Sequence, residues 1–173
     1  YKETSSALQA ADYDLSRTRG DLRSEQDRSQ ELQTALDTRP ETINDFENIS
    51  GVDVEMRDKD LALTVASDLL FNSESETLKK SAQGTLSNVA AALNATYPNQ
   101  SIVIMGYTDT DKITKSKFKS NWHLAFDRAW SVRDYLVSKG VNKDRIAIES
   151  WGPTKPLNTK EASRRVDIVV VDG

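Results

Sequence analysis

The stretch GYTDTDKITKSKFKSNWHLAFDRAWSV, residues 106–132, contains the change of pattern that decides the fold. An apolar run, Ile102 to Met105, leads into it, and the continuity of that run predicts a buried strand. From Asn121 to Lys139, apolar residues recur three or four positions apart, which predicts an amphipathic helix. The strand end therefore presents a carboxylate, Asp109, and the following helix presents a fixed cation, Arg128.

Periodic patterns on both sides of this stretch predict the remaining elements. Residues 52–56 and 61–65 alternate between apolar and polar side chains, which predicts two strands joined by a polar turn. Residues 145–150 and 164–171 predict two more strands, and an apolar stripe predicts a helix from Ser75 to Ala95. Strands alternating with two main helices predict an α+β fold, a two-layer α/β sandwich with a mixed sheet.

The N-terminal region has a different period. Residues 1–38 contain no Pro, and four leucines share one heptad position: Leu8, Leu15, Leu22 and Leu36. This pattern predicts a long polar helix or loose coiled coil that ends near Pro40, because a residue before Pro avoids the helical conformation. We therefore predict a helical spacer at 1–39, a linker at 40–51 and a folded domain at 52–173. A coiled coil would allow a homodimer, and a purely structural oligomer capped by the folded domain is one alternative function.

Composition limits the chemistry that the chain can carry. It has no Cys, which excludes disulfides, thiolate zinc sites and cysteine nucleophiles, and its single His, His123, argues against a histidine metal site or a Ser-His triad. Residues 1–50 hold 6 Lys and Arg against 11 Asp and Glu, and residues 51–173 hold 17 against 16. Neither part has the basic excess that nucleic-acid binding requires. We predict no metal, no cofactor and no nucleic-acid partner.

The sequence itself contains no candidate for a membrane-spanning segment, so we expect any membrane anchor to lie in another part of the protein. No apolar run approaches the roughly 20 residues that span a bilayer. The chain begins with Tyr1 rather than Met, so we expect a piece of a longer protein whose anchor lies elsewhere.

The motif that follows the predicted buried strand is also found in one class of enzymes. Thr108-Asp109-Thr110-Asp111 resembles the D-x-D arrangement of metal-dependent transferases, in which two carboxylates hold a divalent ion. Such an enzyme also needs a phosphate cradle, which is usually Gly-rich and lies at a helix start. The sequence has 7 Gly and none of them cluster. We therefore predict that the protein is not an enzyme.

Four segments occur in an order that resembles one known family. They are Phe71-Asn72-Ser73, Gly106-Tyr107-Thr108-Asp109, Asn121 to Ala129, and Ser163 to Ile168. The order resembles the OmpA/MotB-type peptidoglycan-binding domain, which typically shows F-D-x, G-H-T-D, N-x-x-L-S-x-x-R-A and N-R-R-V-E-I, and the resemblance covers roughly residues 52–171. Departures occur at four positions, where Asn72, Tyr107, Ala125 and Ser163 replace the usual Asp, His, Ser and Asn.

The resemblance implies a ligand and a set of binding residues. The family's ligand is the diaminopimelate side chain of the peptidoglycan stem peptide, which carries an ammonium and a carboxylate on one carbon. Asp109 would accept from the ammonium, and Arg128 can bind the carboxylate through two parallel hydrogen bonds. Asn121 lies nearly two helical turns before Arg128, on the same face. The remaining predicted binding residues are Asn72, Thr108, Leu124 and Arg164.

The implied function is the non-covalent anchoring of an envelope protein to the cell wall. The expected location is the periplasm of a Gram-negative-type bacterium, with attachment to the outer membrane as in a lipoprotein. The start of the second helix and the loop Asp111–Lys119 also resemble flagellar stator members of the MotB type, which is the alternative within the family. Arg164 and Arg165 face opposite ways on one strand, so we expect one to line the pocket and the other to brace an acidic residue.

Overall fold

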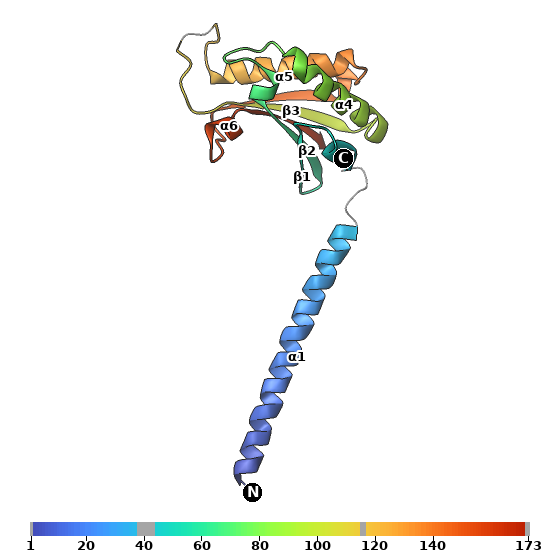
Figure 1. Cartoon of the computed structure of the whole chain (residues 1–173), viewed down its shortest axis with the longest axis vertical. Coiled ribbons are helices and arrows are strands. Elements are labelled where there is room, and N and C mark those ends of the chain that lie inside the picture. The colour runs from blue at the N-terminus through green and yellow to red at the C-terminus, as the bar shows by residue number, and fades with distance from the viewer. Residues whose placement is uncertain (1, 38–43, 115–116, 172–173) are drawn as a thin grey trace. The chain divides into compact units, whose positions relative to one another are not determined.

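The computed structural model describes the backbone of residues 2–37, 44–114 and 117–171. The chain divides into two compact units, Tyr1–Pro40 and Glu41–Gly173 (Figure 1). Within the described residues, no helix combines the length and the apolar character needed to cross a membrane.

The first unit contains a single helix, α1, Lys2–Asp37. At 1.5 Å per residue its 36 residues extend about 54 Å. The described side chains of this helix, residues 13–31, are all exposed, including those of Leu15 and Leu22. The predicted N-terminal helix is confirmed, and the apolar side chains that the structure describes in it lie on the surface of the unit.

The second unit is built on a five-stranded sheet with the order β1-β2-β5-β3-β4. The strands are β1 Asp53–Arg57, β2 Asp60–Ala66, β3 Ser101–Tyr107, β4 Ile146–Gly152 and β5 Arg165–Val171. β3 and β4 run parallel, and the other neighbouring pairs run antiparallel. Helices α4, Lys80–Thr96, and α5, Asn121–Ser138, lie side by side over one face of the sheet (Figure 1). The predicted two-layer α+β sandwich with a mixed sheet is confirmed.

The hydrophobic core lies between the sheet and these two helices. In α4 the core residues are Ala82, Leu86, Val89, Ala90 and Leu93, which include all of the predicted stripe except Leu78. Leu78 lies before the helix and packs against the core while partly buried. Along β5 the even-numbered residues Val166, Ile168 and Val170 enter this core. The intervening side chains, Arg165, Asp167 and Val169, therefore point to the opposite face of the sheet.

The predicted start of the first domain helix is wrong. α4 begins at Lys80 rather than at Ser75. The preceding segment is a loop in which Phe71 pairs with Leu78 and Glu74 adopts a positive φ of 50°. The bridge to Phe71 and the hydrogen bond from the Lys79 N–H to the carbonyl of Leu70 keep Leu78 and Lys79 extended, so the helix cannot extend back to Ser75.

The predicted linker at 40–51 is also wrong over its second half. Asn44–Glu47 form a short helix, α2. Phe46 is completely buried and Ile49 is 7% exposed, and both belong to the hydrophobic core. This segment is part of the folded domain because its two large apolar side chains are removed from water by that domain.

Three further short elements shape the ends of the sheet. They are α3, Ser67–Leu70, the 3-10 helix η2, Lys143–Arg145, and α6, Lys160–Ser163. α3 follows β2 directly and α6 precedes β5, so both lie where β3 ends, because β5 runs antiparallel to β2 and β3. The η2 turn precedes β4 and lies at the opposite end, because β4 runs parallel to β3.

Candidate ligand-binding pocket

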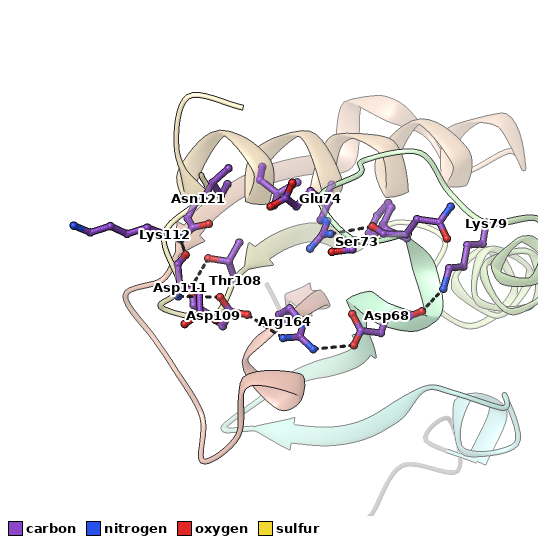
Figure 2. Close-up of a pocket in the computed structure, with 15 residues that line it drawn as sticks. Asp68, Ser73, Glu74, Lys79, Thr108, Asp109, Asp111, Lys112, Asn121 and Arg164 are labelled. Atoms are coloured by element: carbon purple, nitrogen blue, oxygen red, sulfur yellow. Dashed lines mark hydrogen bonds and ion pairs between the residues drawn. The ribbon is translucent and has the colours of Figure 1, made fainter. Parts of the chain in front are cut away.

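A cavity of about 510 Å³ opens at the end of the sheet where β3 finishes and β5 begins (Figure 2). All seven residues singled out from the sequence line it: Asn72, Thr108, Asp109, Asn121, Leu124, Arg128 and Arg164. Sequence reasoning missed four further charged lining residues, which are Asp68, Glu74, Lys79 and Lys112. Asp111, which the sequence offered only as part of the D-x-D motif, also lines the pocket. The pocket therefore carries four acidic and four basic side chains, so it suits a ligand that bears both charges.

Arg128 is the buried cation of the pocket. It comes from α5 and is 4% exposed. Its Nε donates to the carbonyl oxygen of Ser75 at 2.9 Å, and its Nη2 donates to the carbonyl oxygen of Asn72 at 3.4 Å. The guanidinium carbon lies 5.2 Å from the centre of the Phe71 ring. Burial lowers the pKa of Arg128 below its ordinary value, although a guanidinium keeps its proton under all ordinary conditions.

The second cation, Arg164, lies between two carboxylates (Figure 2). Its Nη1 donates to Asp109 Oδ2 at 2.9 Å, and its Nη2 donates to Asp68 Oδ2 at 3.0 Å. Hydrogen bonds to Asp68 and Asp109 raise the pKa of Arg164 above its ordinary value. The expected pairing of one carboxylate with one cation is thus incomplete, because Asp109 already has a basic partner in the protein.

Asp109 is held by the turn that follows β3. Its Oδ1 accepts from the backbone N–H of Asp111 at 3.0 Å, which is the local bond that Asp commonly makes in turns. The backbone N–H of Thr108 donates to the carbonyl of Gly152 at 2.9 Å, and the Thr108 hydroxyl donates to the carbonyl of Asp109 at the same distance. The carboxylate is 14% exposed and therefore stays accessible while its direction is fixed.

The start of α5 completes the wall beside Asp109. Ser120 caps the helix by accepting from the backbone N–H of His123 at 3.5 Å. The Asn121 side-chain amide donates to the carbonyl of Asp111 at 2.7 Å, which ties the helix to the acidic turn. Leu124, 5% exposed, supplies an apolar surface between Asn121 and Arg128 on the same helical face.

The close approach of α5 to the sheet depends on Gly106. A Cβ atom at this position would lie 2.0 Å from the carbonyl oxygen of Ala125 in α5. Only Gly allows strand and helix backbones to come so near. This contact sets the separation between β3, which leads into the turn that carries Asp109, and the helix that carries Arg128.

Arg165, next to Arg164, lies on the other face of the sheet, as alternation predicts. Its Nε lies 3.5 Å from Asp167 Oδ1, and its guanidinium carbon lies 3.8 Å from the centre of the Tyr107 ring. Arg164 therefore lines the pocket, and Arg165 braces a buried acidic residue.

The D-x-D interpretation of Asp109 and Asp111 meets a physical objection. Each carboxylate is paired with a cation, Asp109 with Arg164 at 2.9 Å and Asp111 with Lys160 at 2.8 Å. Among the described residues there is also no group of three or more His, Cys, Asp or Glu side chains that could hold a metal ion. A divalent cation would compete here with two fixed positive charges.

Fold and pocket together define the class to which the chain belongs. Residues 70–166, more than half of the sequence, match the OmpA family. The chain is a member of the OmpA family, and the resemblance drawn from its four ordered motifs is confirmed.

Individual relatives and solved structures agree with this assignment. The chain is 30% identical over 141 residues to the probable lipoprotein YiaD of Escherichia coli (strain K12), covering 78% of this chain and 62% of YiaD. The chain spans 62% of the length of YiaD and 32% of the length of outer membrane protein A of Escherichia coli O157:H7, to which it is 34% identical over 116 residues. The periplasmic domain of Helicobacter pylori MotB superposes with a TM-score of 0.67 at 27% identity, covering 73% of this chain and 83% of that domain. The cell wall anchor of the T6SS from Pseudomonas aeruginosa gives the same TM-score and identity, covering 76% of this chain and 95% of the anchor.

Proposed function

We propose that the domain binds peptidoglycan non-covalently and anchors an envelope protein to the cell wall. The observation that carries this proposal is one pocket lined by a buried guanidinium, Arg128, and an oriented carboxylate, Asp109. Membership of the OmpA family and the likeness to a T6SS cell wall anchor support it. The role is one of binding, without catalysis.

The ligand chemistry follows from the two charges. The diaminopimelate side chain of a stem peptide carries an ammonium and a carboxylate on one carbon, so its two charges must be met a short distance apart. Arg128 is held by two backbone carbonyls through Nε and Nη2, which leaves Nη1 to donate to the ligand carboxylate. Asp109 accepts from the ammonium. Thr108, Asn121, Leu124, Asn72 and Arg164 shape the pocket around these two contacts.

The affinity of one such site is modest. A hydrogen bond to a charged group contributes about 1.5–3 kcal/mol, so two of them give a dissociation constant roughly in the micromolar to millimolar range. The cell wall repeats its ligand, and two linked domains gain from effective concentration. Weak single contacts are therefore sufficient for an anchor that is held at several points.

The proposal is tested by co-sedimentation with purified cell-wall sacculi. Wild type, Asp109→Ala and Arg128→Ala are compared with two matched controls, Asp144→Ala in η2 and Arg133→Ala, a residue of α5 that does not line the pocket. Loss of one charge-assisted bond is expected to weaken wall binding by about ten-fold or more, whereas both controls sediment like wild type. Circular dichroism verifies that each variant is folded. Equal sedimentation of all five proteins removes the site assignment.

We infer a periplasmic location, with attachment to the outer membrane through an anchor outside these residues. The lipoprotein YiaD and the periplasmic domain of MotB, both similar to this chain, support the location. We also infer that α1 associates with a second copy, because Leu15 and Leu22 are exposed and lie seven residues apart. Cell fractionation tests the location, and sedimentation equilibrium tests the dimer; a protein that stays monomeric at high concentration rules the dimer out.

A flagellar stator component is a second candidate, favoured by the likeness to MotB. A stator subunit requires a transmembrane helix, whereas a lipoprotein requires a lipidated Cys. The coding sequence upstream of Tyr1 distinguishes them, and a lipidated Cys there would exclude the stator.

A further inference from the structure

Asp68 is a pocket residue that no sequence motif singled out. It lies in the short helix α3, and its carboxylate meets Arg164 from the side opposite Asp109 (Figure 2). Its side chain is 61% exposed, so the protein does not need it to fill the core. Because this exposed carboxylate forms an ion pair with a cation of the pocket, it can influence ligand binding.

The charges around Arg164 explain what a second carboxylate contributes. If Arg164 had Asp109 as its only partner, the two charges would cancel and the pair would attract an ammonium weakly. With Asp68 on the other side of the same guanidinium, these three groups carry a net charge of −1. A third carboxylate, Glu161, lies farther away at 3.8 Å from Arg164 Nη2, and its side chain is 74% exposed. The net charge of the three groups matches one ammonium, just as Arg128 matches one carboxylate. The Arg164 cluster then presents a negative charge to the ammonium, and Arg128 presents a positive charge to the carboxylate.

Asp68 also acts on the other half of the site. Burial lowers the pKa of Arg128, and the charge of Asp68 acts against this shift, as does that of Asp109. The charge of Asp68 is therefore felt at both ends of the ligand position. Arg164 links Asp68 in α3 to Asp109 in the turn after β3, so the same side chain also fixes the geometry of the negative half.

We propose that Asp68 is an affinity-determining residue of this site: it occupies one side of Arg164, so that Asp109 keeps its attraction for the ligand's ammonium. This inference rests on the proposed function, since it assumes a ligand that carries an ammonium beside a carboxylate. Asp68 acts through Arg164 and is in this sense a positioning residue.

The test compares two small probes on the full chain. meso-Diaminopimelate carries an ammonium beside each carboxylate, and pimelate is the same dicarboxylate without the amines. Asp68→Asn is expected to weaken diaminopimelate binding by about two- to five-fold, a modest effect because Asp68 is exposed to solvent. Pimelate binding should stay equal or strengthen, since a negative charge has been removed. The ratio of the two affinities, measured by NMR titration, therefore falls.

Two further variants separate charge from folding. Asp68→Glu keeps the charge and should restore most of the ratio, while Asp144→Asn, with the same charge change at the opposite end of the sheet, should leave the ratio as in wild type. An unchanged ratio in Asp68→Asn, or an equal loss for both probes, overturns the inference about Asp68. Failure of the proposed function gives a different result. In that case wild type does not bind diaminopimelate, or Asp109→Ala binds it as well as wild type does. Either result contradicts both proposals.

Discussion

Two consecutive arginines place similar charge clusters on the two faces of one sheet. The pocket cluster consists of Asp68, Asp109 and Arg164, and the reverse-face cluster consists of Arg57, Arg165 and Asp167. Each contains ion pairs between guanidinium and carboxylate groups at distances of 2.8–3.5 Å. The difference is their surroundings, because Asp167 is completely buried whereas Asp68 is 61% exposed.

Burial determines what each cluster can do. Asp167 accepts from Arg57 at 2.8 Å and from the Thr64 hydroxyl at 3.0 Å, so its oxygens are satisfied by partners on neighbouring strands. Arg165 packs over the Tyr107 ring and is 7% exposed. This network holds strands together, and a ligand cannot reach the Asp167 carboxylate although the Arg57 side chain is 39% exposed. The pocket cluster can exchange a partner for a ligand, because solvent and solutes reach its carboxylates.

The strongest test of this comparison is Asp167→Ala. Removing the carboxylate leaves the guanidinium of Arg165 buried without its charge partner, which costs about 3–5 kcal/mol. Urea denaturation of the variant should therefore show a large loss in the free energy of unfolding. We expect Asp109→Ala, by contrast, to cost about 1 kcal/mol, since Arg164 keeps Asp68 as a partner. Equal losses for the two variants would break the distinction between a structural and a ligand-binding cluster.

A smaller effect on stability is expected at alkaline pH from Tyr107, which lies next to the reverse-face cluster. Burial and the nearby charge of Asp167 raise the pKa of Tyr107 above its ordinary value of about 10. The folded state therefore favours the neutral phenol, and the stability that this supplies is complete below pH 10 and is lost as the pH rises through the folded pKa. The stability advantage of wild type over Tyr107→Phe should shrink between pH 9 and pH 11 in urea unfolding. A constant difference in stability between wild type and Tyr107→Phe across this range would contradict a raised pKa of Tyr107.

The smallest effect belongs to an ion pair beside the pocket. Lys117 donates to Glu76, and this hydrogen bond lowers the pKa of Glu76. The stability that it supplies is present above the unfolded pKa of about 4.3 and is lost as the pH falls through the folded pKa. Glu76→Gln should cost about 0.2–1 kcal/mol at pH 7, as is usual for an exposed pair.

Lys117→Met provides the matched control for this pair. Both single variants and the double variant should lose similar stability at pH 7, and the wild type and Glu76→Gln should converge in acid. A loss above 2 kcal/mol at pH 7 would show that this exposed pair stabilises the fold as strongly as the reverse-face cluster does.

Elements whose residues repeat with a fixed period could be predicted from the sequence. The helical stripe that includes Leu86 and Leu93 and the alternation of Leu61 and Leu63 follow from one buried face, so pattern and structure agree. The pocket residues Asp109 and Arg128 were found because their motifs recur in a known order. Their shared location in one cavity agrees with that expectation.

What the sequence did not reveal depends on tertiary contacts. Phe46 lies in a stretch too short to show a period, and only the fold shows that it fills the core. The α4 start shifts to Lys80 because the loop before it is held by Arg128 and by the pairing of Phe71 with Leu78. Asp68 is separated from Arg164 by 96 positions, and no local pattern indicates that the two side chains meet.

The contact at Gly106 links the shape of the domain to the span of its pocket. With 2.0 Å between a would-be methyl group and the Ala125 oxygen, any larger residue must wedge the helix away from the strand. Asp109 and Arg128 would then move apart together with the two backbones. Gly106 thus fixes the distance between the two charges. Substitutions around the rim can change which ligand the pocket prefers, but a wider separation of Asp109 and Arg128 requires that α5 move away from the sheet.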